Sequence, residues 1–119
     1  MFDTYTQELR LLRWETLHIV KGDVMFLKIG TRKRKFPLVI RIEFLHDKTG
    51  VFEMYVSRRV AKPSAEKHDF KYNGTAIEIN YPEETKVEWL YFTIEAVTAL
   101  DFSILAFFSE GLGFYRTII

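Results

Sequence analysis

The chain has 119 residues, of which 48% are hydrophobic and 16% aromatic, including eleven Phe. This length suits one domain, since typical domains contain about 100–150 residues, and the apolar content argues against intrinsic disorder. Seventeen Lys and Arg against sixteen Asp and Glu leave a formal net charge of +1, so no overall field draws the chain to nucleic acid or an anionic membrane. Without cysteine, disulfides and thiolate metal sites are excluded. We expect residues 1–119 to form one soluble domain, alone or as a module of a longer protein.

The first 14 residues give an ambiguous pattern. Leu9 and Leu12 fit one face of a helical turn, whereas Tyr5, Leu9 and Leu11 fit an extended arm. We therefore expect either a short N-terminal helix or an edge segment. The start lacks the basic and apolar parts of a secretory signal, and the most apolar stretch, residues 102–108, is far shorter than the about 20 residues that cross a bilayer as a helix. The sequence predicts no membrane span.

From Thr16 onward the chain has the pattern of β-strands, with short apolar runs separated by Gly, Pro, Asn and charged turns. In one run Ile40 and Ile42 alternate with Arg41 and Glu43, as in a strand with one buried face. The predicted strands cover residues 17–20, 24–29, 36–44, 51–57, 70–72, 76–80, 89–96, 102–108 and 114–118. This pattern predicts an all-β domain, an antiparallel, jelly-roll-like β-sandwich of about eight strands.

Two turn sequences suggest how neighbouring strands are joined. Residues 21–23 contain Gly22, which can adopt the positive φ of a tight turn, so we expect a hairpin or a bulged strand there. The pair Asn73-Gly74 is the strongest hairpin sequence in the chain, and it separates two predicted strands.

Several segments together carry a resemblance to a known family. They are residues 20–23 before the strand 24–29, residues 38–44, residues 50–57, Lys62-Pro63-Ser64 with Asp69, and residues 90–96 with 102–108. The sequence Tyr55-Val56-Ser57 followed by Pro63-Ser64 is the most telling part. In pattern, this stretch resembles the pre-peptidase carboxy-terminal domain family of small jelly-roll-like β-sandwiches.

The resemblance implies a sandwich that assists binding or folding and supplies no catalytic residue. Similar sandwiches occur inside larger eukaryotic proteins, including calpain-like and cytoskeletal ones. Because the chain begins without a secretory signal and has many charged residues, it is more similar to that second group. On this basis we expect a cytoplasmic location with a cytoskeletal association.

The strongest local charge feature is a run of four cations between two predicted strands. It consists of Arg32, Lys33, Arg34 and Lys35. Such a run is most often a solvated loop, but it can also bind an acidic surface. No aromatic residues interleave the cations for base stacking, so we expect an acidic protein partner rather than nucleic acid.

The strand predicted at residues 89–96 has an unusually aromatic second face. Leu90 and Phe92 are expected to point inward, which leaves Trp89 and Tyr91 pointing outward together with Thr93 and Glu95. Tyr55 and Tyr72 are candidates for further members of this face. Such rings either pack against neighbouring chain or form anchors of a protein interface.

Catalytic and metal motifs are weak. His46-Asp47 and His68-Asp69 are sequence neighbours in polar turns without a third ligand at a recognisable spacing, and no serine lies in a Gly-x-Ser-x-Gly motif. A calcium site would require convergence of acids from separate loops. The candidates for it are Asp23, Asp47, Asp69, Glu83, Glu84 and Asp101.

We therefore predict a non-catalytic protein-interaction or structural module. Its binding residues are expected to be Arg32, Lys33, Arg34, Lys35, Trp89 and Tyr91. The partner is expected to be an acidic protein or a second copy of the chain, and no cofactor is expected. The alternative is a sandwich that binds carbohydrate, or calcium and lipid, through its loop tips.

Overall fold

The computed structural model describes residues 5–31, 36–46, 48–82 and 86–109, and these ranges form nine β-strands. The strands are β1 (Thr6–Glu8), β2 (Glu15–Ile19), β3 (Val24–Gly30), β4 (Leu38–Phe44), β5 (Phe52–Ser57), β6 (Phe70–Tyr72), β7 (Ala76–Ile79), β8 (Trp89–Ala96) and β9 (Leu100–Phe108). In the ranges described, no helix is long and apolar enough to cross a membrane.

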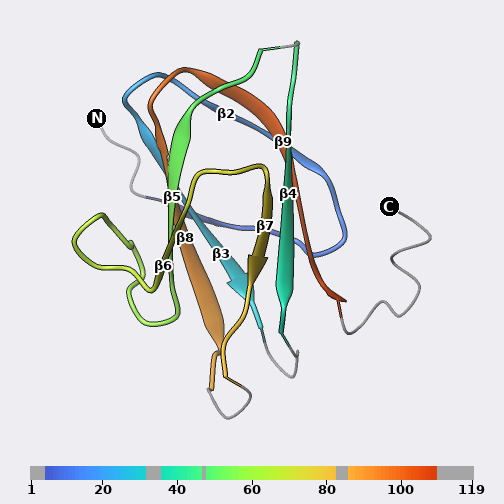
Figure 1. The fold of residues 1–119 in the computed structure, drawn as a ribbon, viewed down its shortest axis with the longest axis vertical. Helices are drawn as coiled ribbons and strands as arrows, with labels where there is room; N and C mark the ends of the chain where they lie inside the picture. The colour runs from blue at the N-terminus through green and yellow to red at the C-terminus, as the bar shows by residue number, and fades with distance from the viewer. Residues whose placement is uncertain (1–4, 32–35, 47, 83–85, 110–119) are drawn as a thin grey trace.

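The strands form two sheets that pack face to face (Figure 1). One sheet has five strands in the order β1-β3-β8-β5-β6, and the other has four in the order β2-β9-β4-β7. Every ladder is antiparallel except the one between β1 and β3, which is parallel. The prediction of an all-β sandwich is confirmed.

Most connections cross from one sheet to the other, and this overturns both hairpin predictions. Gly22, with φ at 82°, lies between β2 of the four-stranded sheet and β3 of the five-stranded sheet. The pair Asn73-Gly74 likewise joins β6 to β7, which belong to different sheets. A turn sequence reports only a local change of direction, and here each strand finds its hydrogen-bond partner elsewhere in the chain. The exception is the β5–β6 loop, residues 58–69, which joins two paired strands.

The predicted strand positions agree with the structure, with two differences. The ambiguous N-terminal segment contains β1, an edge strand rather than a helix. The predicted last strand, residues 114–118, lies outside the described residues.

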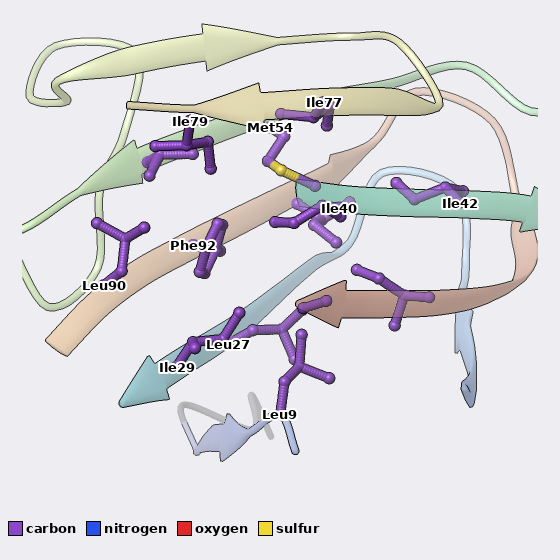
Figure 2. Packing of buried hydrophobic residues seen from close by; sticks show 14 of the residues in the cluster. Leu9, Leu27, Ile29, Ile40, Ile42, Met54, Ile77, Ile79, Leu90 and Phe92 are labelled. Atoms are coloured by element: carbon purple, nitrogen blue, oxygen red, sulfur yellow. The ribbon is translucent and has the colours of Figure 1, made fainter. Parts of the chain in front are cut away.

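The core lies between the sheets and is built by alternate residues of the central strands. Figure 2 shows Leu27 of β3 and Phe92 of β8 pointing toward the opposite sheet, from which Ile40 of β4 and Ile79 of β7 point back. All four side chains are at most 1% exposed. Burial of this kind stabilises the fold by roughly 25 cal/mol for each Å² of apolar surface removed from water.

The connection between β4 and β5 passes very close to the core at Gly50. A Cβ added at Gly50 would lie 2.3 Å from Cδ2 of Leu100 and 3.1 Å from Cε1 of Phe44. Leu100 is 2% exposed, so its side chain has little room to move aside. Glycine is therefore required here by space.

We predict that Gly50→Ala lowers the free energy of unfolding by about 1–3 kcal/mol through overpacking. Urea denaturation monitored by circular dichroism measures this change. Gly74→Ala is the matched control, because nothing lies within 4 Å of a Cβ there and the two variants should differ clearly. Equal stability of both variants would contradict the close packing at Gly50.

Candidate functional site

The predicted aromatic surface lies on the outer side of the five-stranded sheet. Leu90 and Phe92 are buried in the core, so Trp89 and Tyr91 point away from it. β8 is the middle strand of its sheet, flanked by β3 and β5. We call this surface the outer aromatic face, and its members are Phe26, Lys28, Tyr55, Trp89 and Tyr91.

Trp89 lies at one end of the outer aromatic face. It is opposite Gly30 in the β3–β8 ladder, and its Cζ3 atom would be 3.6 Å from a Cβ at that position. The ammonium group of Lys28 lies 4.6 Å from the centre of the indole ring, a cation–π distance. The ring is thus held against the sheet and capped by a cation, with part of its surface still exposed.

Tyr91 lies beside Trp89 in the middle of the sheet. It is opposite Lys28 on one side and Ser57 on the other. Ser57 is 1% exposed, and its hydroxyl accepts hydrogen bonds from the backbone N–H groups of Arg59 (3.1 Å) and Val60 (2.9 Å). Ser57, which lies beside Tyr91, therefore fixes the backbone at the start of the β5–β6 loop.

The β5–β6 loop covers the other end of the outer aromatic face. The ammonium group of Lys62 lies 5.0 Å from the ring centre of Phe26, and the ring of His68 lies 5.2 Å from that of Tyr55. Pro63 of the same loop is buried. Since Phe26 and Tyr55 lie on opposite sides of β8, the loop extends across that strand. Trp89 and Tyr91 are the aromatic rings of β8 that remain partly open to solvent.

Burial and strand register correct three sequence expectations. Thr93 has the outward register that was predicted, yet it is only 3% exposed, and Tyr55 is only 4% exposed. Tyr72 is not part of the face, because it is opposite the fully buried Met54 and so faces the core side of the sheet. The aromatic surface available to a partner is therefore smaller than predicted.

Acidic side chains lie along the same face beyond Tyr55. Glu53 and Glu95 are directly opposite each other in the β5–β8 ladder, an unfavourable like-charge pair. Lys71 relieves part of this repulsion with its ammonium group 3.6 Å from Glu53. Burial, with a smaller contribution from the negative charge of Glu95, raises the pKa of Tyr55.

The far end of the β5–β6 loop is held by Asp69. One oxygen of its carboxylate accepts hydrogen bonds from the backbone N–H of Arg58 (3.1 Å) and from the hydroxyl of Tyr81 (2.7 Å). The backbone N–H of Asp69 donates to the carbonyl of Val56 at 2.7 Å. Both ends of the loop are therefore bonded to the framework, which keeps the loop over the face.

The predicted basic run lies outside the described residues. It consists of Arg32, Lys33, Arg34 and Lys35. The preceding residue, Thr31, is 2% exposed, and its backbone N–H donates to the carbonyl of Glu88 at 3.0 Å. Thr31, the last described residue before the run, therefore lies at the end of the outer aromatic face where Trp89 lies.

Lys28 and Lys62 each lie over a ring of the outer aromatic face, a role that was not predicted from the sequence. Lys28 alternates with Leu27 and Ile29, so its outward direction could have been predicted from the strand pattern. Its position over Trp89 could not, because that contact depends on how β3 pairs with β8.

The loop acids weighed for calcium do not converge among the described residues. Asp69 is engaged by Tyr81, Asp101 lies beside His18, and Asp23 accepts a hydrogen bond from the backbone N–H of Val24. Within the ranges that the structure covers, no group of three His, Asp or Glu side chains could hold a metal ion. Asp47, Glu83 and Glu84 lie outside those ranges.

The architecture matches a solved structure, the pre-peptidase C-terminal domain of collagenase from Bacillus anthracis. The two share a TM-score of 0.60 over 90% of this chain and 99% of that chain, at 10% sequence identity. The fold is therefore similar to that of this pre-peptidase C-terminal domain. At this identity the likeness establishes the fold alone. No family model matches the sequence, and no curated protein matches it.

We predict a loss of stability at alkaline pH that depends on Tyr81. Burial and the hydrogen bond to Asp69 raise the pKa of Tyr81 above its ordinary value of 10.0. Below pH 10 the phenol is protonated in both states and the bond is intact. Above pH 10 the unfolded state ionises first, so the stability contribution of the phenol declines as pH rises.

Tyr81→Phe removes this contribution. At pH 7 the variant should be less stable than the wild type by about 1–3 kcal/mol, because it lacks a hydrogen bond to a charged acceptor. At pH 11 the difference between the two proteins should become smaller. Urea titrations of both proteins at pH 7 and pH 11 measure this difference in the free energy of unfolding. A difference that stays the same at the two pH values would contradict the raised pKa of Tyr81.

Proposed function

We propose that this protein is a non-catalytic interaction module that binds a protein partner through the open part of the outer aromatic face. The observation that carries the proposal is the contrast along β8. Thr93 is buried, and its cross-strand neighbour Tyr55, which lies against His68 of the β5–β6 loop, is only 4% exposed, whereas Trp89 and Tyr91 keep exposed surface. Large aromatic rings at a partly open surface are the residues that most often anchor protein interfaces.

The charges around these rings favour an acidic partner. Lys28 lies directly over Trp89, and the run that begins at Arg32 follows one residue after Thr31. A carboxylate on the partner could pair with Lys28 while the rings are buried. Charges of this kind raise the association rate and select against cationic partners.

The fold likeness supports the non-catalytic part of the proposal, because the solved structure is a C-terminal domain of a peptidase rather than the peptidase itself. The resemblance found in the sequence points in the same direction. The cytoplasmic, cytoskeleton-associated setting stays a prediction.

We predict that Trp89→Ala and Tyr91→Ala each weaken the complex by roughly 30-fold or more, the effect of losing an anchor worth about 2 kcal/mol. Analytical ultracentrifugation measures self-association. Quantitative co-purification, followed by titration with the recovered partner, measures a heterologous complex. Both variants should keep a cooperative thermal unfolding transition.

Trp14→Ala is the matched control, because Trp14 is an exposed indole, 45% accessible, in the connection between β1 and β2 rather than on β8. It should bind the partner like the wild type. Equal weakening by Trp14→Ala, or unfolding of both β8 variants, would overturn the assignment of the face.

We predict a separate, salt-dependent effect of the basic run. Replacing Arg32, Lys33, Arg34 and Lys35 by Ser should leave the melting temperature nearly unchanged, because the run connects two strands. Binding should weaken most at low ionic strength, since exposed charges are screened over about 8 Å at physiological salt. Unchanged affinity at low salt would show that the run does not take part in binding.

A further inference from the structure

The connection between β6 and β7, residues 73–75, joins an edge strand of one sheet to an edge strand of the other (Figure 1). Both ends of this connection are held by backbone pairing. Tyr72, the last residue of β6, is paired with β5, and the carbonyl of Thr75 accepts a hydrogen bond from the backbone N–H of Ile42 at 2.8 Å. Residues 73–74 lie between these two anchors.

These two residues, Asn73 and Gly74, are exposed and carry reactive groups side by side. Among the residues that the structure describes, neither the side-chain amide of Asn73 nor the backbone N–H of Gly74 makes a hydrogen bond. Nothing lies within 4 Å of a Cβ built at Gly74, so the surroundings are open to solvent. Backbone N–H groups are usually engaged in folded proteins, and a free one beside a free amide is available for chemistry.

The chemistry open to this pair is an intramolecular displacement of ammonia. The backbone nitrogen of Gly74 attacks Cγ of Asn73, so that an N–Cγ bond forms and closes a cyclic imide. The bond between Cγ and Nδ2 breaks, and the amide nitrogen leaves as ammonia with the proton of the Gly74 N–H. Water then opens the ring at either carbonyl. Opening at Cγ gives aspartate, and opening at the main-chain carbonyl gives isoaspartate, in which the chain continues through Cγ.

Glycine at position 74 is what makes the nitrogen accessible. It has no Cβ to crowd the attack, and its backbone reaches conformations closed to other residues. The chain contains one other asparagine, Asn80, which is also exposed but precedes Tyr81. Tyr81 has a large side chain that is only 8% exposed. The same amide is therefore present twice, once beside an open nitrogen and once beside a crowded one.

The structure assigns a self-modification site to the connection between β6 and β7, where Asn73 loses ammonia to the backbone nitrogen of Gly74 and ends as aspartate or isoaspartate. Aspartate adds one negative charge on the surface. Isoaspartate also adds one methylene to the main chain of a connection that keeps β7 in register with β4, in which Ala76 is opposite Arg41. The isoaspartate form is therefore expected to be the less stable product.

The test is incubation of the folded full chain in mildly alkaline buffer, followed by peptide mapping with mass spectrometry. Asn73 should convert steadily to a mixture of aspartate and isoaspartate, while Asn80 in the same sample stays an amide. Gly74→Ala should slow the conversion about tenfold, the effect of a barrier raised by about 1.4 kcal/mol. Asn73→Gln should abolish it, because the longer side chain must close a larger ring.

A stability measurement separates the two products. The isoaspartate fraction, isolated by ion exchange, should melt at a lower temperature than the unmodified chain. Freshly purified Asn73→Asp is the matched control, because it carries the added charge without the added methylene, and it should melt like the wild type. The site lies apart from Trp89 and Tyr91 in the sheet order, so the proposed partner binding is tested independently.

Three results would overturn the inference. An Asn73 that stays intact in the folded chain but reacts in urea would show that the folded connection holds the two groups apart. Equal conversion of Asn73 and Asn80 would show that the open nitrogen has no role. An unchanged rate in Gly74→Ala would show that the nitrogen of residue 74 is not the attacking group.

Discussion

The two sheets are held together by apolar side chains that alternate along their central strands, and this packing determines where the functional surfaces can lie. Leu90 and Phe92 are fixed in the core, so the backbone of β8 has no rotational freedom and Trp89 and Tyr91 must point outward. A shift of one residue in register would exchange the two faces and bury the rings. The core residues touch no partner themselves, but they contribute to binding because they hold the outer aromatic face in one orientation.

Which part of that face stays open depends on polar contacts rather than on the core. Ser57 and Asp69 accept backbone hydrogen bonds at the two ends of the β5–β6 loop, and the loop extends across β8 between them. Lys62 and His68 then cover Phe26 and Tyr55. Tyr55 is thereby buried, whereas Phe26, Trp89 and Tyr91 keep surface that can be buried against a partner.

The crossing connections have a further effect at the edge of the sandwich. Where the chain passes between β1 and β2, its backbone bonds to both sheets through Leu9 and Leu12. Leu9 and Leu11 of this crossing pack against the core, and other side chains of the crossing line an open polar hollow. The face of one sheet and the edge between the two sheets thus carry chemically different surfaces, one aromatic with lysines above it and one built on arginines and an indole.

Apart from β1, the sequence by itself determined the strands that the structure describes, their inward residues and the outward direction of Trp89 and Tyr91, because the two-residue period of a strand is a local property. The tertiary structure alone decided which strands pair. Gly22 and Asn73-Gly74 have the composition of hairpin turns, yet each joins strands of different sheets, since ladder partners are chosen by burial of whole faces and not by the turn between them. Burial of Tyr55 and Thr93, the position of Lys28 over Trp89 and the hollow between β1 and β2 all depend on residues far apart in sequence. No local pattern contains that information.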